Sequence, residues 1–495
     1  MNNSLYINGQ WQTANGAEFT STNPVDDEIL WQGASATYVD VESAVDAATQ
    51  AFPAWSRLSI QQRFGMMQHF NKQLAAVSEE FAIVISKEIG KPLWESRQEV
   101  STMLKKLDQA LDSYNIRCTA KHFQREHIAD RTQYRAHGVM AVFGTFNLPG
   151  RMSNGHIVPA LLAGNTIVFK PSEHGALTGE FLTKLWQKSS LPEGVFNLVQ
   201  GGINAGQALA ASSRVSGIFF TGSYEVGREI HRQSAGHPQK ILSLEMGGNN
   251  PLIVTNIDDL QAAVYLTICS TYMTSGQRCV CARRLILPTW DRREEFIELL
   301  LKSVEAIKIG SWQKEGVFMG PVVSRNAASK LLRQQQSLID QGATILKKMT
   351  PDNHIPTLLS PGIIDVTDIE NRHDEEIFGP LLQIIRVDTF QQAIDEANNT
   401  SYGLAAGLFC DKPELFEQFF AQIQAGIVKW NQPFTGSSPQ APFGGTGNSG
   451  NHRPASSYSA DNFSYPIASM ESPVLCLPSQ LNPGIEISAL GSTIL

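Results

Sequence analysis

Residues 138–170 read GVMAVFGTFNLPGRMSNGHIVPALLAGNTIVFK and indicate the fold class of the chain. Two short apolar runs, Val139–Phe143 and Thr166–Lys170, have the length and composition of buried strands. Strands that alternate with helices predict an α/β fold around a mostly parallel sheet. The same texture continues downstream, with apolar runs at 195–199, 217–220 and 251–254 and helical segments at 180–188 and 205–212.

The regions on either side of this stretch have different patterns. Residues 41–91 carry apolar side chains at spacings of three and four, which predicts helices. Lys91-Pro92 interrupts that run, because proline restricts the residue before it. Residues 118–135 are polar and alternate weakly, so we expect a two-stranded excursion from the main body. Residues 433–454 are rich in Gly, Ser and Pro and should form a loop.

The composition limits the class of protein. The chain has 495 residues, enough for about three domain-sized units. It contains 39 Lys and Arg against 47 Asp and Glu, a net charge of −8, so it has no general electrostatic reason to bind nucleic acid or an anionic membrane. Six cysteines in a chain of this length do not make a disulfide scaffold.

No targeting or membrane segment is evident. The start of the chain, MNNSLYINGQ, lacks the basic and apolar regions of a secretory signal. No apolar stretch approaches the roughly 18 residues of a membrane span. We therefore expect a cytoplasmic protein whose cysteines are thiols.

Residues 445–450, GTGNSG, match the letters of the dinucleotide fingerprint G-x-G-x-x-G. That fingerprint needs a strand before it and a helix after it. Pro442-Phe443-Gly444 precedes the motif and Asn451-His452-Arg453-Pro454 follows it, and neither flank fits. We expect a loop near a site here rather than a Rossmann fingerprint.

One cysteine lies in a segment suited to chemistry, Thr274-Ser275-Gly276-Gln277-Arg278-Cys279. Glycine and small polar neighbours make Cys279 a candidate nucleophile, although a lone cysteine is more often a buried thiol. Cys281 lies two residues further on, and a Cys-x-Cys pair could be half of a metal site. No His/Cys cluster with zinc-like spacing lies nearby, so we expect no metal.

Two other residues could assist a nucleophile. Glu245 is a single acid before Met246-Gly247-Gly248, and partial burial there would raise its pKa and suit it to general-base work. Asn147 follows a predicted strand and precedes Pro149-Gly150, so its amide could stabilise an oxyanion. The alternatives are a carboxylate and an asparagine that only serve turns.

Two segments suit a dinucleotide. Phe169–Glu173 ends a strand with a cation and an acid, which can bind ribose hydroxyls. Phe220–Gly227 combines a predicted strand, a glycine turn and a predicted helix start, which would direct backbone N–H groups at a phosphate. Neither pattern is specific by itself.

Together these segments resemble the aldehyde dehydrogenase superfamily, in kind and in order along the chain. The resemblance extends from Tyr6 to about Ser472. Its specificity lies in four motifs taken jointly: Glu245–Gly248, Gly276–Cys279, Glu376–Pro380 and Pro442–Gly445.

The resemblance implies a role for each residue. Cys279 would be the nucleophile that adds to an aldehyde carbonyl, with Asn147 and the Cys279 backbone N–H as the oxyanion hole. Oxidation of the thiohemiacetal would leave a thioester, and Glu245 would activate the water that hydrolyses it. The implied cofactor contacts are Lys170, Glu173, Phe220, Gly222, Ser223, Gly227, Glu376 and Phe378.

Two of these residues bear on the cofactor and the acyl acceptor. A carboxylate at Glu173, beside the ribose 2′-hydroxyl, favours NAD, because a 2′-phosphate there would meet like charge. Relatives that pass the acyl group to coenzyme A typically lack the base at Glu245, so its presence favours water.

The family fold implies three parts. They are a Rossmann-type NAD-binding domain at 1–117 and 135–246, an α/β catalytic domain at 247–455, and a small β oligomerisation arm and tail at 118–134 and 456–495. Such arms join subunits, so we expect a homodimer or a homotetramer.

Some segments are most similar to the branch of the family that oxidises N-succinylglutamate 5-semialdehyde in the bacterial arginine succinyltransferase pathway. They are residues 147–150, 154–165, 245–251 and 449–454, whereas Arg151-Met152-Ser153 differ from that branch. That substrate carries several carboxylates, so its pocket needs cations. The candidates, each of which could instead form a structural ion pair, are Arg278, Arg151, His452 and Arg453.

Two alternatives remain open. The same chemistry could serve another semialdehyde or an aliphatic aldehyde, or the scaffold could be a catalytically silent structural protein. The joint presence of Cys279, Glu245 and Asn147 argues against silence, since each could have been lost without harm to the fold. The favoured partner is therefore a small-molecule aldehyde.

Overall fold

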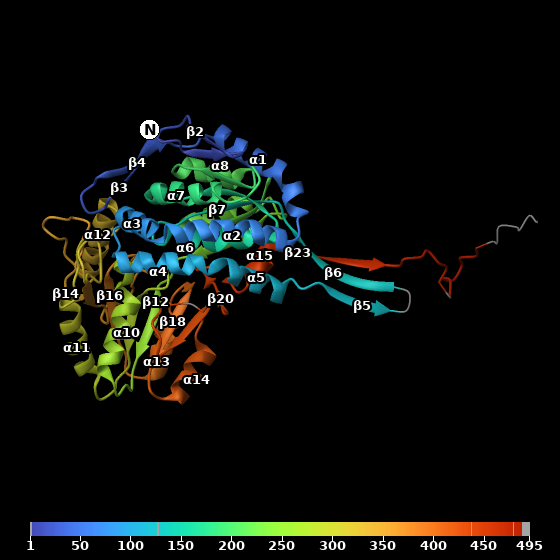
Figure 1. Cartoon of the computed structure of the whole chain (residues 1–495). Coiled ribbons are helices and arrows are strands. Elements are labelled where there is room, and N and C mark those ends of the chain that lie inside the picture. The colour runs from blue at the N-terminus through green and yellow to red at the C-terminus, as the bar shows by residue number, and fades with distance from the viewer. Residues whose placement is uncertain (1, 126–127, 437, 479, 488–495) are drawn as a thin grey trace, which may run out of the picture.

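The computed structural model describes residues 2–125, 128–436, 438–478 and 480–487. In this part of the chain, two seven-stranded sheets carry the two halves of the body, and a three-stranded sheet projects from it (Figure 1). Residues 126–127 of the predicted arm and 488–495 of the predicted tail lie outside the described residues.

The first large sheet contains the strands that the opening stretch predicts. Strands β7 to β11 are parallel to one another, and β1 runs antiparallel to β9. Every residue of β7 and of β8 is buried, which explains why their sequences read as continuous apolar runs. The spatial order is β11 (Ile241–Met246), β10 (Val215–Gly222), β7 (Val139–Phe143), β8 (Thr166–Lys170), β9 (Phe196–Val199), β1 (Leu5–Ile7) and β2 (Gln10–Gln12).

Helices cover both faces of this sheet. Alternate residues of β7 face opposite cores: Val139 and Ala141 pack on one side, and Met140 and Val142 on the other. The first side is closed by α1 (Tyr38–Ser56), α8 (Ile203–Ala211) and α9 (Tyr224–Ser234). The second side is closed by α2 (Ile60–Ala76), α3 (Ser78–Ile89), α4 (Leu93–Leu104), α5 (Lys106–Arg117), α6 (Pro149–Ala163) and α7 (Ala176–Gln187).

The second large sheet is parallel except for its edge strand β14. The strand predicted at 251–254 is formed, but it belongs to this sheet and not to the first one. The order is β14 (Thr344–Lys347), β15 (Gly362–Asp365), β16 (Leu381–Arg386), β13 (Ala282–Leu287), β12 (Asn250–Val254), β18 (Ala405–Phe409) and β19 (Ile427–Trp430). One face packs on α10 (Leu260–Tyr272) and α11 (Arg293–Glu305), and the other on α12 (Arg325–Asp340), α13 (Phe390–Asn398) and α14 (Pro413–Gln422).

The three-stranded sheet extends away from the body (Figure 1). Its strands β5 (Lys121–Arg125), β6 (Ile128–Ala136) and β23 (Ser464–Glu471) pair antiparallel, so the predicted excursion gains a third strand from the C-terminal region. The remaining short elements are β3 (Glu18–Thr22), β4 (Ile29–Ala34), η1 (Glu173–Gly175), η2 (Met273–Gly276), β17 (Tyr402–Gly403), β20 (Pro442–Phe443), β21 (Thr446–Gly447), β22 (Ala455–Ser456) and α15 (Ser459–Phe463).

The chain crosses from the first sheet to the second between β11 and β12, through Gly247, Gly248 and Asn249. We propose a domain boundary at this crossing. Among the described residues, no helix combines the length and the apolar character needed to cross a membrane.

Candidate active site

A cavity of about 900 Å³ is built from loops of both large sheets. The first sheet contributes residues 144–148 after β7 and residues 221–226 at the end of β10. The second sheet contributes Arg278 and Cys279, which precede β13, and Glu376, which precedes β16. The cavity therefore lies between the carboxyl ends of the strands of the first sheet and the segments that lead into the strands of the second sheet. The carboxyl ends of parallel strands are where α/β sheets usually bind ligands.

Cys279 follows a turn of unusual backbone conformation. Thr274, Ser275 and Gly276 have φ of 53°, 57° and 69°, so two residues with side chains adopt the left-handed region. Such residues cost about 1–3 kcal/mol each and persist only where the surroundings hold them. A Cβ at Gly276 would lie 2.1 Å from the carbonyl oxygen of Gly379, so only glycine fits there.

Buried partners hold this turn in place. Glu95 of α4 accepts hydrogen bonds from the backbone N–H of Thr274, at 3.0 Å, and from its hydroxyl. The Ser275 hydroxyl donates to the carbonyl of Gly320 at 2.6 Å. The Asn250 amide donates to the Cys279 carbonyl at 2.6 Å, which fixes the backbone of the nucleophile candidate itself.

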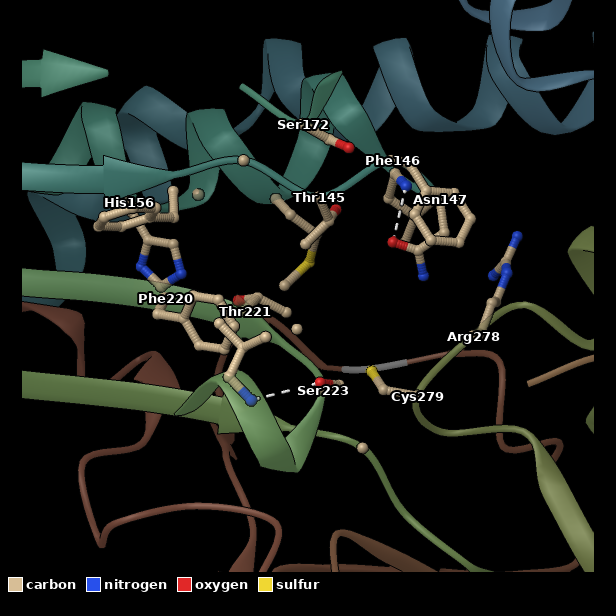
Figure 2. A pocket seen from close by; sticks show the side chains of 18 of the residues that line it. Thr145, Phe146, Asn147, His156, Ser172, Phe220, Thr221, Ser223, Arg278 and Cys279 are labelled. Atoms are coloured by element: carbon tan, nitrogen blue, oxygen red, sulfur yellow. Dashed lines mark hydrogen bonds between the residues drawn. The ribbon is translucent and has the colours of Figure 1, made fainter. Parts of the chain in front are cut away.

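The Cys279 side chain is half-buried and lines the cavity, where its sulfur is drawn in Figure 2. Burial raises the pKa of its thiol to about 12, and the carboxylates of Glu376 and Glu245 act in the same direction. The thiol is therefore protonated at neutral pH. A base must take that proton before the sulfur can attack a carbonyl.

Asn147 comes to Cys279 from the first sheet. Its Nδ2 donates to the carbonyl of Gln277 at 2.7 Å, and its Oδ1 accepts from the N–H of Leu148 at 3.0 Å. Lys91, paired with the buried Glu99, donates to the Asn147 carbonyl at 3.1 Å. A carboxamide has two N–H donors, and one is used here, so the second can be directed at a substrate oxygen beside Cys279 (Figure 2).

Glu245 lies in β11 and is 3% exposed. Burial raises the pKa of its carboxyl well above the ordinary value. Within the described residues its Oε2 has no hydrogen-bond partner. Glu245 is not part of the cavity wall, yet it is close enough to Cys279 to affect that thiol. A buried carboxyl with a raised pKa and a free oxygen suits proton transfer.

The GTGNSG loop supports Glu245. The Met246 N–H donates to the Ser449 carbonyl at 2.9 Å, and Glu245 forms an isolated antiparallel bridge with Gly450. A Cβ at Gly444 would lie 3.3 Å from Glu245 Oε1. The motif is a loop only in part, since β21 covers Thr446–Gly447, and it packs against the carboxylate that the sequence identified separately.

The other end of the cavity has features that fit a nucleotide. Ser223 caps α9 by accepting from the Val226 N–H at 3.4 Å, and within the described residues the N–H groups of Tyr224 and Glu225 have no recorded partner. Thr221 has a buried hydroxyl without a partner in the same part of the chain. Free N–H groups at a helix start suit a phosphate. The predicted cofactor residues that line the cavity are Lys170, Glu173, Phe220, Gly222, Ser223, Glu376 and Phe378.

The surroundings of two predicted cofactor contacts, Gly227 and Glu376, show what else these residues do. Gly227 does not line the cavity; a Cβ there would lie 2.4 Å from the Met246 sulfur, so Gly227 allows α9 to pack on β11. Burial raises the pKa of Glu376 to about 7, although Arg283 opposes this. A Cβ at Gly247 would lie 1.8 Å from a Glu376 carboxylate oxygen, so Gly247 makes room for that acid.

The four cations predicted to bind substrate separate into two groups. Arg278 and Arg151 line the cavity. Arg278 donates from Nη2 to Glu95 and from Nε to the Thr274 hydroxyl, each at 2.8 Å, so most of its guanidinium holds the turn before Cys279. Burial lowers the pKa of Arg151, as does the nearby Arg278, whereas Glu99 and Cys279 oppose this. Arg151 is therefore within electrostatic reach of the thiol.

His452 and Arg453 are not among the residues that line the cavity, and as substrate ligands they stay a prediction. Both side chains are exposed. The Asn451 side chain before them is bonded to the backbone of Leu244 and Leu242, and the Arg453 carbonyl accepts from the Ser243 hydroxyl. This segment holds β11 through these hydrogen bonds.

The metal alternative gains no support from the geometry. Among the described residues, no group of three His, Cys, Asp or Glu side chains gathers in an arrangement that could hold a metal ion. Cys281 is fully buried, and its carbonyl accepts from the Asn250 amide at 2.9 Å.

Sequence reasoning missed several residues of the site. Lys106, the first residue of α5, lines the cavity, and so does Thr145, whose hydroxyl is buried without a partner among the described residues. Glu95 and Glu99 are fully or almost fully buried acids of α4 that hold the two sides of the site. Lys106 had no signal to find, because a lysine at a helix start usually faces solvent.

Comparison with known proteins agrees with this geometry. The aldehyde dehydrogenase family model matches residues 11–466. A curated relative, the N-succinylglutamate 5-semialdehyde dehydrogenase of Pseudomonas fluorescens (strain Pf0-1), is 47% identical over 98% of this chain and 100% of its own length.

Solved structures show the same fold. An NADP-dependent enzyme of Escherichia coli has a TM-score of 0.90 at 28% identity, covering 95% of this chain and 98% of its own. The betaine aldehyde dehydrogenase of Staphylococcus aureus in complex with NAD⁺ has a TM-score of 0.90 at 25% identity, covering 96% of each chain. The family model and the relative of similar length together show that this chain belongs to the aldehyde dehydrogenase family.

Proposed function

We propose that the enzyme oxidises N-succinyl-L-glutamate 5-semialdehyde to N-succinyl-L-glutamate, with NAD as oxidant and water as acyl acceptor. The observation that carries the choice of substrate is the placement of Arg151 in the cavity wall, within electrostatic reach of Cys279. A cation at this position suits an aldehyde that carries a carboxylate. The name of the curated relative gives the same aldehyde as its substrate, which supports the proposal.

The first step is attack by Cys279. A base takes the thiol proton as the sulfur adds to the aldehyde carbon, and the carbonyl oxygen becomes an oxyanion. The carboxylate of Glu245 is the candidate base, because burial raises its pKa. The second N–H of Asn147 and the Cys279 backbone N–H stabilise the oxyanion. Donors that are already in place before the reaction lower the barrier most.

The second step converts the thiohemiacetal on Cys279 into a thioester. The nicotinamide nucleotide, when bound, would take the hydrogen of the former aldehyde carbon together with its two electrons, as a hydride. Glu376 and Phe378 would hold its nicotinamide end against the cavity wall near Cys279, while Ser223 and the start of α9 would hold its phosphates. Phe378 is itself held by an edge-on contact with Phe146, at 5.9 Å between ring centres.

The third step is hydrolysis of the thioester. Glu245, which has by then passed the Cys279 proton to solvent, takes a proton from a water molecule, and the water adds to the acyl carbon and releases the Cys279 thiolate. The thiolate regains a proton, and N-succinylglutamate leaves as a carboxylate. A general base contributes about 10²- to 10⁴-fold to such a step.

The choice of NAD over NADP rests on Glu173. This acid is exposed in η1 and lines the cavity, and its charge acts on Lys170. A 2′-phosphate beside Glu173 would meet like charge. We expect kcat/KM to be higher with NAD than with NADP, and Glu173→Gln to reduce that preference. An unchanged preference in the variant would remove Glu173 from the explanation.

We also propose that the sheet of β5, β6 and β23 joins subunits into a homodimer or homotetramer. Its outer residues include Phe123 and Met470, which are 62% and 79% exposed. Light scattering on the intact protein measures the assembly, and a monomer at micromolar concentration would contradict this proposal.

The test of the substrate is a set of initial rates with several aldehydes, followed as formation of reduced nicotinamide. The set contains N-succinylglutamate 5-semialdehyde, another semialdehyde and an aliphatic aldehyde of similar length. We expect the highest kcat/KM with the succinylated compound. Similar values for all would leave the chemistry in place and remove this substrate, and no oxidation of any aldehyde by protein with a free Cys279 thiol would exclude the enzyme as proposed.

A further inference from the structure

Lys106 places a second cation in the same cavity. It is the first residue of α5 and follows directly on the exposed Lys105. Its side chain is partly accessible and lines the cavity, together with Thr102 and Met103 of α4. Within the described residues, Lys106 has neither a recorded hydrogen bond nor an ion pair. An ammonium group that opens into a cavity without an acidic partner is unusual, since buried charges are normally paired.

The neighbours of Lys106 do not neutralise it. Burial lowers the pKa of Lys106 to about 8, and the positive charge of Arg151 acts in the same direction. His156, also on α6, is uncharged at neutral pH, because burial and the nearby Lys106 lower its pKa to about 4. Glu99 of α4 is engaged by Lys91 and by the N–H groups of Gly150 and Arg151.

The charges along the cavity wall are divided between its two ends. Helices α4, α5 and α6 contribute Lys106 and Arg151 to the described lining, and they contribute no acid. All the acids of the described lining come from η1, α9 and the segment before β16, and they are Glu173, Glu225, Glu229, Glu375 and Glu376. The end formed by α4, α5 and α6 therefore offers positive charge without a competing acid, whereas the nucleotide end combines its acids with Lys170 and the helix start that suits a phosphate.

The two cations of this end interact with each other. The ionised form of Cys279 would act on Arg151, the positive charge of Arg151 acts on Lys106, and Lys106 acts on His156. Arg151 is thus linked electrostatically to both the thiol and Lys106. The proposed substrate has a matching order of groups: its α-carboxylate is separated from the aldehyde carbon by a short methylene chain, and its succinyl carboxylate lies further away, beyond an amide.

We propose that Lys106 is a specificity-determining residue that binds the succinyl carboxylate, while Arg151 binds the α-carboxylate. This inference rests on the proposed function and adds the point of contact for each carboxylate. Charge-assisted hydrogen bonds at both positions would favour the dicarboxylate over shorter or neutral aldehydes. Lys106 would contribute to binding and not to the chemistry at Cys279.

The test uses three aldehydes and, besides Lys106→Arg, three further variants of the full-length enzyme. N-succinylglutamate 5-semialdehyde carries both carboxylates, N-acetylglutamate 5-semialdehyde lacks the succinyl carboxylate, and N-succinyl-4-aminobutanal lacks the α-carboxylate. The variants are Lys106→Met, Arg151→Met and, as the matched control, Lys105→Met, which removes an exposed charge one residue away. kcat and KM are measured for each pair.

We expect Lys106→Met to lower kcat/KM by about 10- to 100-fold for the two succinylated aldehydes and to leave the acetylated one within about twofold. Arg151→Met should lower kcat/KM for the two aldehydes that carry an α-carboxylate. Lys105→Met should leave kcat/KM unchanged for all three aldehydes. Lys106→Arg should recover most of the activity with the succinylated aldehydes. The loss should appear mainly in KM.

Two kinds of failure are distinguishable. If the wild-type enzyme does not prefer the dicarboxylate, the proposed function is wrong. If it does, but Lys106→Met retains the preference or loses activity equally with all three aldehydes, the role of Lys106 is wrong and the proposed function stands. Activity with the acetylated aldehyde also reports whether Lys106→Met is folded, and activity with N-succinyl-4-aminobutanal does the same for Arg151→Met.

Discussion

The segment before Cys279 and the junction of α4 and α5 contribute cations to the same cavity in opposite ways. In residues 273–279, the Cys279 segment, the polar groups are tied to the protein: Glu95 binds Arg278 and Thr274, and the Gln277 side chain accepts from the Val323 N–H at 3.0 Å. At the junction, Lys106 is left without a recorded protein partner in the described residues.

This difference separates two functions. Groups that act on the reacting atoms need one fixed position, and fixed hydrogen bonds provide it before substrate arrives. A group that recognises a charged substrate is more useful if its partner is the substrate itself, because an internal salt bridge would have to be broken first. Arg278 therefore belongs with the structural groups, although the sequence alone suggested a substrate ligand.

The largest effect should come from substitution of Glu245, one of the groups that act on the reacting atoms. We expect Glu245→Gln to lower kcat by about 10²- to 10⁴-fold with every aldehyde, because the general base is lost. If attack remains possible, one equivalent of reduced nicotinamide should form in a burst and the acyl-enzyme should accumulate. Stopped-flow absorbance measures the burst of reduced nicotinamide, and intact-protein mass spectrometry measures the acyl-enzyme. A loss confined to succinylated aldehydes would contradict the division between the regions.

The next effect concerns the pair of Arg278 and Glu95, which are 9% and 0% exposed as side chains. We expect Arg278→Met to destabilise the protein by about 3–5 kcal/mol, because it leaves Glu95 buried without its cation. Denaturant unfolding measures this. Arg292→Met serves as control, since its partner Glu295 is exposed and surface pairs contribute about 0–1 kcal/mol. A stable Arg278→Met enzyme with a raised KM only for anionic aldehydes would return Arg278 to the substrate ligands.

Asn147 should produce a slightly smaller effect. Removal of one oxyanion donor lowers kcat by about 10²- to 10³-fold. We therefore expect Asn147→Ala to lower kcat within this range, for neutral and anionic aldehydes alike. Rates are compared across the same set of aldehydes, and thermal unfolding of the variant shows whether the bond to Gln277 is also important for folding. A change in KM alone would show that Asn147 binds substrate and does not stabilise the transition state.

The sequence predicted the parts of the fold that depend on local pattern. Val139–Phe143 and Thr166–Lys170 are formed with the predicted bounds, because every residue in them is apolar or buried. Strands β1 to β4 were not predicted, since they are short, and β2 and β3 are largely exposed. The pairing of β6 with β23 joins residues more than 300 positions apart and has no local signal.

The site shows the same limit. Motifs brought Cys279, Asn147 and Glu376 to attention, and the structure places all three around one cavity. Arg453 was chosen because it follows a motif in sequence, but its backbone faces β11 and its side chain lies outside the cavity. Lys106 belongs to a helix that packs on α6, so only the tertiary fold brings it to the substrate end.

The smallest effect expected is a change in substrate preference with pH. Lys106 is charged below its pKa of about 8 and neutral above it. The groups that act on it or respond to it do not change over this range, because Arg151 stays charged and the pKa of His156 is about 4. Attraction for the succinyl carboxylate is therefore present below about pH 8 and is lost as the pH rises.

The ratio of kcat/KM for N-succinylglutamate semialdehyde to that for the N-acetyl compound should fall by up to about tenfold between roughly pH 7 and pH 9. Taking the ratio removes the titrations of Cys279 and Glu245, which both aldehydes share. Lys106→Arg, whose guanidinium remains charged, should keep the ratio constant, and a ratio that falls equally in this variant would assign the titration to another group.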